Sequence, residues 1–131
     1  MAIKDYSEEE DFYSQGFERQ GVLSVWLSLE DRRGEERIDT LQDLCGVGYY
    51  RLSDQESNSL DHELVDVERL LLPLSYSSSF SKDVISTARM KGVGAARRIV
   101  VQYDFAYDPK KITRAIAEDP VFIGVFNYSE V

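Results

Sequence analysis

The segment VVQYDFAYDP, residues 100–109, constrains the fold of this chain more than any other stretch, because its residues alternate in character along its whole length. Successive side chains of a β-strand point to opposite faces of the sheet. One face of the predicted strand carries Val101, Tyr103, Phe105 and Tyr107, and the other carries Gln102, Asp104 and Asp108. We therefore expect a strand whose aromatic face packs beneath helices, while its polar face stays uncovered.

Two further strands are predicted at residues 21–30 and 120–128, which are rich in β-branched and aromatic residues. Alternation within the first assigns Leu23, Val25, Leu27 and Leu29 to the core and leaves Trp26 on the more open face. We expect the strand that contains residues 100–107 and the strand at 120–128 to lie at the centre of the sheet. Residues 49–59 are ambiguous: a brief strand that runs into an exposed loop fits them, but the serines, asparagine and acids of the loop disfavour both helix and strand.

Apolar residues at helical spacing predict the helices. The first covers Ile38 to Cys45, with Asp39 or Thr40 as its N-cap. The second ends at Pro73 and begins either at Leu60 or only near Asp66. The clearest one presents Phe80, Val84, Ile85 and Ala88 on one face and ends before Gly92. Residues 108–116 resemble a short capped helix, with a loop as the alternative.

This order of elements predicts a single α+β domain with a mainly antiparallel sheet and helices packed on one face. Residues 21–131 form the domain. Residues 1–20 form an acidic N-terminal extension, in which SEEE at residues 7–10 has the pattern of a capping box. We expect this extension to be helical and to pack on the domain.

The charge distribution favours a basic partner. The formal net charge is −9, and six acids with no lysine or arginine lie between Asp54 and Glu68. Such a surface argues against nucleic-acid binding and attracts a basic protein. The single cysteine, Cys45, excludes an internal disulfide and suits a reducing compartment. No apolar run is long enough to cross a bilayer and no secretory signal pattern is present, so we expect a cytoplasmic protein with no membrane partner.

No motif in the sequence requires catalysis, a metal or a cofactor. Asp104 and Asp108 lie on one side of an extended strand at roughly 13 Å, too far apart for a carboxylate pair that shares a proton. Cys45 and His62 have no sequence context typical of a nucleophile and its base. We therefore expect a protein that is not an enzyme and holds no cofactor.

Several segments in order resemble a known family. They are VLSVWLSLED near the start, LPLSYSSSF before a helix, IVVQYDFAYDP, and FIGVFNY near the end. Together, over about residues 21–128, the chain resembles the immunity protein 22 family of bacterial polymorphic toxin systems. It departs from the usual pattern in its acidic extension and in a compressed stretch between Asp31 and Leu44. The resemblance implies a small cytoplasmic α+β protein that binds and neutralises a cognate toxin domain without catalysis.

The resemblance assigns no binding residues, because immunity surfaces differ with their toxins. Charge and face assignment supply the expected partner-binding residues, which are Trp26, Asp54, Glu56, Asp61, Glu63 and Asp104. The acids would attract a basic toxin, as many nuclease toxins are, and the exposed aromatic ring would anchor it. Two alternatives remain: a small enzyme in which Asp104 and Asp108 converge with the acids of residues 54–68, and a general protein-interaction module with no toxin partner.

Overall fold

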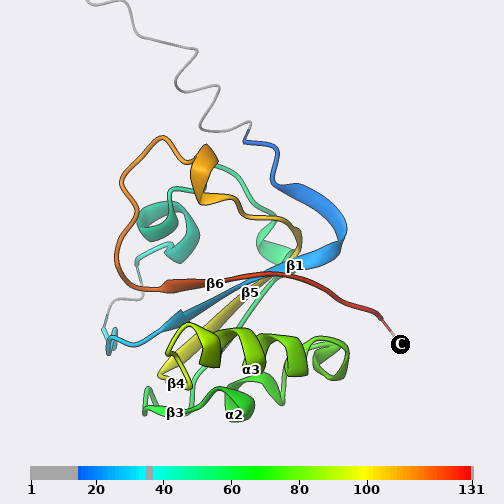
Figure 1. The fold of residues 1–131 in the computed structure, drawn as a ribbon. Helices are drawn as coiled ribbons and strands as arrows, with labels where there is room; N and C mark the ends of the chain where they lie inside the picture. The colour runs from blue at the N-terminus through cyan, green and yellow to red at the C-terminus, as the bar shows by residue number, and fades with distance from the viewer. Residues whose placement is uncertain (1–14, 35–36, 131) are drawn as a thin grey trace, which may run out of the picture.

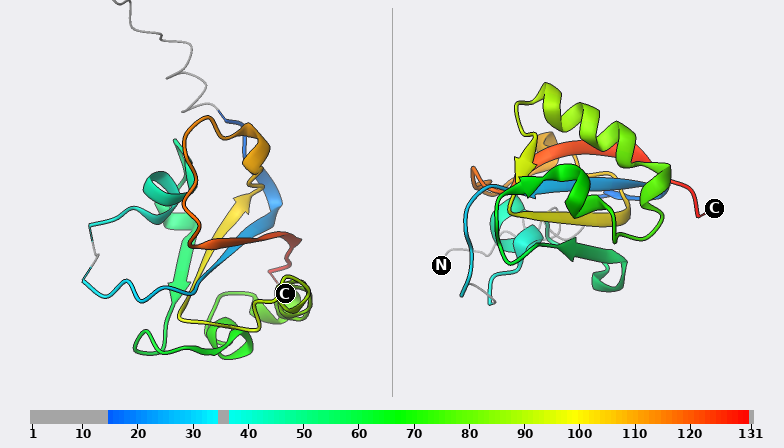
Figure 2. Two further views of the ribbon diagram at one scale, coloured as in Figure 1. Left: turned by 60° about the vertical axis from the view of Figure 1, so that its left-hand side comes forward. Right: turned by 90° about the horizontal axis from the view of Figure 1, so that it is seen from below.

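Four antiparallel strands form the main sheet of the protein, in the order β2-β5-β1-β6. A computed structural model describes residues 15–34 and 37–130 of the chain. The strands are β1 (Glu18–Ser28), β2 (Gln55–Asn58), β5 (Arg98–Phe105) and β6 (Val121–Asn127). Figure 2 shows them side by side, with β1 and β5 between the two edge strands. The prediction that the last strand lies at the centre is wrong, because β1 separates β6 from β5.

The remaining elements are short. A two-stranded sheet pairs β3 (Val65–Asp66) with β4 (Ala95–Ala96). The α-helices within the described residues are α2 (Val67–Leu71) and α3 (Ser81–Met90). The one-turn helices are η1 (Thr40–Leu44), η2 (Leu52–Asp54), η3 (Ser77–Ser79) and η4 (Pro109–Lys111). The α+β single-domain prediction is confirmed. Within residues 15–34 and 37–130, no helix combines the length and apolarity needed to cross a membrane.

Helices α2 and α3 cover one face of the sheet (Figure 1). Phe80, Val84 and Ala88 from the α3 region pack on Leu23, Val25 and Leu27 of β1, and all are buried. These are the core faces that the sequence pattern predicts for both elements. Leu29 is the exception: β1 ends at Ser28, and the Leu29 side chain is 41% exposed.

The opposite face of the sheet is also covered, contrary to expectation. The η1 region and the chain around η4 lie over it (Figure 1), and a second core forms beneath them. That core contains Phe17, Trp26, Leu41, Cys45, Val47, Val100, Phe105 and Tyr107. Trp26 is only 1% exposed, and its ring lies 5.1 Å from that of Tyr107 and 5.5 Å from that of Phe122 between centroids. The prediction of an open Trp26 is therefore wrong.

The residues predicted to form the aromatic face of β5 are divided between the two cores. Val101 and Tyr103 belong to the helix-covered core, whereas Phe105 and Tyr107 belong to the second core. Asp104 separates them with a positive φ of 55°, and the pairing with β1 shifts register at this point. One residue in this conformation reverses the side-chain alternation, as in a β-bulge. Because both faces are covered, an aromatic residue is suited to either.

Several boundaries differ from the sequence predictions. The expected division at residue 21 falls inside β1, which starts at Glu18. The helix expected in the SEEE segment lies within residues 1–14, outside the described residues. Helix α2 begins at Val67, so the later of the two expected starts is confirmed. After η4 the chain leaves helical structure, and Ile116 is exposed.

Candidate functional site

A pocket of about 230 Å³ gathers three of the six predicted partner-binding residues, Asp54, Glu56 and Asp104. We call it the tyrosine pocket. Its wall comes from η2 and β2, from the chain after α2, from the end of β5 and from the chain after β6. Its lining residues are Ser53, Asp54, Glu56, Ser75, Tyr76, Tyr103, Asp104, Tyr128 and Glu130. Segments far apart in the sequence thus meet at one site.

Three tyrosine rings form an aromatic cluster in this wall. The rings of Tyr76 and Tyr128 are stacked at a centroid distance of 6.0 Å and an interplanar angle of 22°. The ring of Tyr103 stands edge-on to both, at 5.2 Å from Tyr128 and 6.3 Å from Tyr76. Tyr103 is nearly buried, whereas Tyr76 is 42% exposed. The cluster therefore continues from the core to the surface.

Hydrogen bonds fix the orientation of the polar groups. The Oδ1 atom of Asp104 accepts from the Tyr128 hydroxyl at 2.7 Å and from the Gly21 amide at 3.0 Å. The Tyr103 hydroxyl donates to the Ser75 carbonyl at 2.6 Å, and the Ser75 amide donates to Glu56 Oε1 at 3.0 Å. Three of these contacts join different segments of the wall, and the Gly21 amide holds Asp104 from outside the lining, so the pocket is preorganised.

The pocket carries negative charge beside its tyrosine rings. Among the described residues, four carboxylates line it, those of Asp54, Glu56, Asp104 and Glu130. Among the described bases only Arg51 pairs with any of them, at 3.7 Å from Asp54. Burial raises the pKa values of the Tyr103 and Tyr128 hydroxyls, and nearby carboxylates raise them further. The phenols consequently stay neutral and act as hydrogen-bond donors. Carboxylates beside the exposed ring of Tyr76 suit a cationic group.

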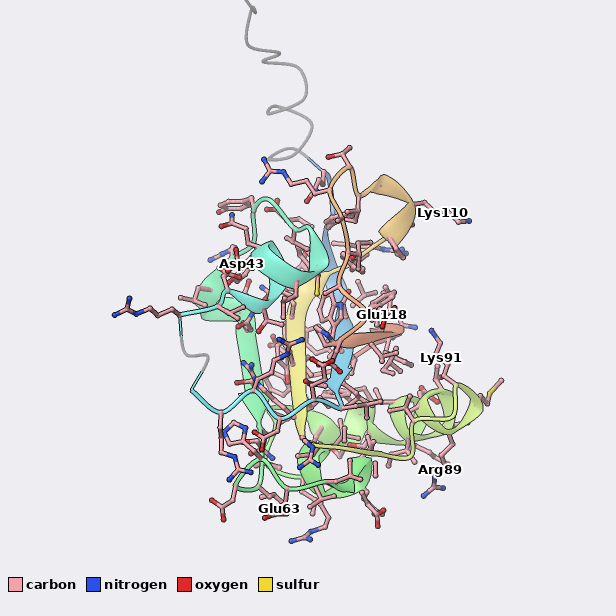
Figure 3. The ribbon with its side chains drawn as sticks, turned by 90° about the vertical axis from the view of Figure 1, so that its left-hand side faces the viewer. Asp43, Glu63, Arg89, Lys91, Lys110 and Glu118 are labelled. Atoms are coloured by element: carbon pink, nitrogen blue, oxygen red, sulfur yellow. The ribbon has the colours of Figure 1, made fainter. Side chains whose placement is uncertain are left out.

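The other predicted residues do not join this site. Asp61 and Glu63 lie in the turn before β3, where their charges act on Arg33. Figure 3 shows Glu63 at the opposite end of the molecule from Lys110. Asp108, which the enzyme alternative required, caps η4 by accepting a bond from the Lys110 amide. The predicted acidic surface is therefore divided between two regions.

Tyr76, Tyr128 and Glu130 line the pocket although the sequence reasoning did not select them. Tyr128 follows directly after a predicted strand, and Tyr76 lies in a polar segment with a positive φ of 60°. Only the folded chain brings these positions to the end of β5. The sequence signal that could have pointed to Tyr76 and Tyr128 is that both lie in segments that resemble the immunity protein 22 family.

The fold and this site define a small α+β protein with an acidic, tyrosine-lined pocket at one end of its sheet. Comparisons of the chain with models of known families, with curated proteins and with solved structures found no match. Among the described residues, no group of three or more histidine, cysteine, aspartate or glutamate side chains is arranged to hold a metal ion.

Proposed function

We propose that this protein binds a basic partner protein through the tyrosine pocket, and that the partner is a cognate toxin domain that it neutralises without catalysis. One observation carries the proposal: Asp54, Glu56 and Asp104 converge with three tyrosine rings in a single pocket. The resemblance to the immunity protein 22 family supplies the identity of the partner. Under this proposal the protein acts in the cytoplasm of the cell that makes the toxin.

The chemistry of the pocket supports a guanidinium or ammonium group as the inserted part of the partner. A cation above a tyrosine face is attracted by the ring, typically by about 0.5–2 kcal/mol. Carboxylates add charge-assisted hydrogen bonds, and a pocket at the centre of an interface is where binding energy concentrates. The net charge of −9 accelerates the approach of a basic protein.

The division of the acidic residues permits a matched experiment. The variant D54N/E56Q removes two charges from the tyrosine pocket, and D61N/E63Q removes two charges from the other region. Glu56→Gln keeps an oxygen that can accept from the Ser75 amide, so the wall is preserved. Both variants alter the net charge equally. Association with the product of the adjacent gene, where the proposal expects the toxin domain, is measured by surface plasmon resonance.

We expect D54N/E56Q to weaken toxin binding at least tenfold and to abolish rescue of growth on co-expression, because both charges face the inserted cation. The variant D61N/E63Q should change binding less than threefold. Equal losses of affinity in the two variants would show that the charges act by general electrostatic attraction and not through the tyrosine pocket. Failure of the wild-type protein to bind or to rescue growth would show that the toxin domain is not its partner.

The enzyme alternative keeps one supporting observation, the gathering of Asp104 with Asp54 and Glu56. It differs from the binding proposal in what it predicts for D54N/E56Q: loss of substrate turnover by the purified chain, with toxin binding unchanged. An interaction module without a toxin partner would instead bind a host protein, and that binding would be lost in D54N/E56Q.

A further inference from the structure

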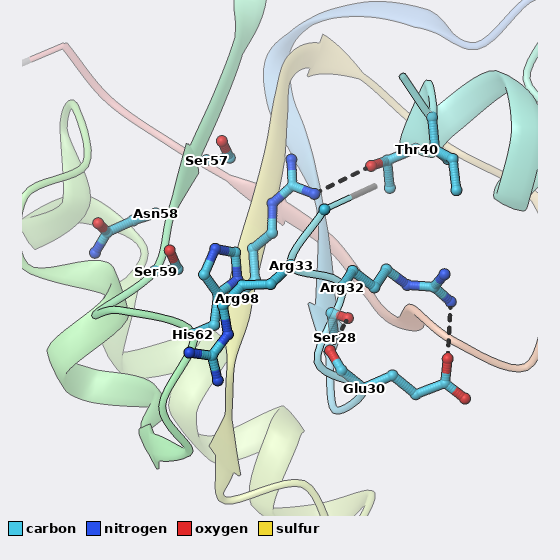
Figure 4. A pocket seen from close by; sticks show the side chains of 12 residues that line it. Ser28, Glu30, Arg32, Arg33, Thr40, Ser57, Asn58, Ser59, His62 and Arg98 are labelled. Carbon is cyan, nitrogen blue, oxygen red and sulfur yellow. Dashed lines mark hydrogen bonds and ion pairs between the residues drawn. The ribbon is translucent and has the colours of Figure 1, made fainter. Parts of the chain in front are cut away.

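A second pocket, of about 370 Å³, lies at the other end of the sheet. We call it the arginine pocket, after Arg32, Arg33 and Arg98 in its lining. Arg98 starts β5, and Asp104 lies six positions further along the same strand. At about 3.3 Å per residue the two pockets are separated by roughly 20 Å. Figure 4 shows the arginine pocket between the end of β2 and the segment that follows β1.

The three arginines differ in how their charge is balanced. Arg32 pairs with Glu30 at 3.1 Å and with the buried carboxylate of Asp119 at 3.3 Å. Arg33 pairs with Asp31 at 2.6 Å. Among the described residues, Arg98 donates only to the Thr40 hydroxyl, at 3.4 Å, and pairs with no carboxylate. Arg98 is thus a half-buried cation without a counter-ion among the described residues.

A half-buried guanidinium without a counter-ion destabilises the folded state. Burial, together with the charge of Arg32, lowers the pKa of Arg98, yet an arginine side chain remains protonated at neutral pH. A guanidinium removed from water and facing another guanidinium destabilises the fold unless an anion compensates it. An anion bound in the pocket would supply this compensation beside Arg98.

Other hydrogen-bond donors surround Arg98. The hydroxyls of Ser57 and Ser59 and the imidazole of His62 line the pocket, and none has a side-chain hydrogen bond to any described residue. Figure 4 shows the two serines on the β2 side, with His62 and Arg98 beside them. These donors come from several directions, which suits the three free oxygens of a phosphate better than the planar pair of a carboxylate.

The lining also limits the rest of the ligand. Among the described residues that line it there is no phenylalanine, tyrosine or tryptophan, and Ile38 is the only large apolar residue. Most pockets for drug-sized ligands are predominantly apolar, with few polar groups. The arginine pocket therefore offers little surface on which a nucleobase could stack.

We propose that the arginine pocket binds a small phosphate-bearing molecule, with Arg98 as the principal ligand of the phosphate and Ser57, Ser59 and His62 as further donors. This proposal is independent of the toxin proposal, because it concerns the other end of the sheet and its test needs no partner protein.

The test is a titration of the wild-type protein with inorganic phosphate at low ionic strength, followed by proton NMR. His62 is the only histidine in the chain, so its imidazole resonances report directly on the pocket. We expect saturable shifts of these resonances with phosphate and much weaker binding of acetate. A titration with methyl phosphate distinguishes a free phosphate ligand, which it would not replace, from a phosphate ester, which it would mimic.

The decisive comparison is between Arg98→Gln and Arg89→Gln, which remove the same charge. Arg89 is exposed in the last turn of α3 and does not line the arginine pocket. We expect Arg98→Gln to weaken phosphate binding at least tenfold, Arg98→Lys to recover part of it, and Arg89→Gln to leave it unchanged. Equal weakening by both glutamine variants, or no saturable shift of His62, would overturn the proposal.

Thermal unfolding gives a second readout that is independent of NMR. In the absence of phosphate, Arg98→Gln should unfold at the same temperature as the wild type or higher, because an uncompensated charge is removed. Phosphate should raise the unfolding temperature of the wild type and of Arg89→Gln, but not that of Arg98→Gln. A variant that unfolds much earlier without phosphate would show that Arg98 serves the fold instead of a ligand.

Discussion

At the scale of single residues, Asp104 connects the fold to the candidate site. Its backbone adopts the left-handed conformation with φ at 55°, which aspartate tolerates better than most residues. Its carboxylate receives hydrogen bonds from Gly21 and Tyr128. The same side chain therefore stabilises the register shift between β1 and β5 and orients the phenol of Tyr128 in the tyrosine pocket.

Three substitutions at Asp104 separate its backbone role from its side-chain role. Asp104→Ala should lower the free energy of unfolding by about 2–3 kcal/mol, because it combines left-handed strain with an amide that loses its acceptor. Asp104→Gly relieves the strain alone and should cost about 1–2 kcal/mol. Asp104→Asn keeps an acceptor and should cost under about 1 kcal/mol. Urea unfolding measures all three, and equal losses for alanine and glycine would show that the backbone conformation carries no strain.

Trp26 shows why a residue can be assigned to the wrong face. Its position in the alternation of β1 was predicted correctly, opposite Leu23, Val25 and Leu27. The error was the assumption that only one face of the sheet is covered. The segments that cover Trp26 contain few regular elements, so their sequences carry no strong periodic signal.

At the scale of elements, the irregular pairing of β1 and β5 is completed by a side chain. Ser24 is fully buried in β1. Its hydroxyl donates to the Phe105 carbonyl at 2.7 Å and accepts from the Tyr107 amide at 2.9 Å. The Ser24 hydroxyl thus takes the place of a backbone partner for the Phe105 carbonyl and the Tyr107 amide, which lie beyond the register shift and are shielded from water.

Removal of the Ser24 hydroxyl should destabilise the fold. Ser24→Ala leaves a buried carbonyl and a buried amide without partners, and we expect a loss of about 2–4 kcal/mol in the free energy of unfolding. Ser86→Ala on the exposed surface of α3 is the control and should stay within about 0.5 kcal/mol of the wild type. Chemical denaturation compares the two. A loss below about 1 kcal/mol in Ser24→Ala would mean that water replaces the hydroxyl.

Elements with strong local signals were predicted closely. Helix α3 keeps its predicted apolar face, and Asp39 caps η1 by accepting from the Gln42 amide. Strand order and face coverage were predicted less well, since both depend on contacts between distant segments. The candidate site follows the same division: the sequence selected Asp54, Glu56 and Asp104 by charge, but their grouping with Tyr76 and Tyr128 depends on the register shift at Asp104.

At the scale of the whole molecule, two aromatic cores on opposite faces make the protein sensitive to alkaline pH. Burial raises the pKa of the Cys45 thiol to about 12. Burial is also the main cause that raises the pKa values of Tyr50, Tyr103, Tyr107 and Tyr128 above the ordinary range of a phenol. In the unfolded chain these groups lose their protons from about pH 8.5 for cysteine and about pH 10 for tyrosine.

The sign of the effect follows from the proton balance. Above about pH 9 the folded state retains protons that the unfolded state has released, so the free energy of unfolding falls as the pH rises. Each such group contributes a slope of up to about 1.4 kcal/mol per pH unit.

We expect the free energy of unfolding to be constant between about pH 7 and 8. It should fall gently from about pH 9, where only Cys45 contributes, and steeply above about pH 10, where the tyrosines contribute as well. Urea midpoints across this range test the profile, and Cys45→Ala should abolish only the gentle part. A variant profile that coincides with the wild type below about pH 10 would show that the thiol ionises freely in the folded protein.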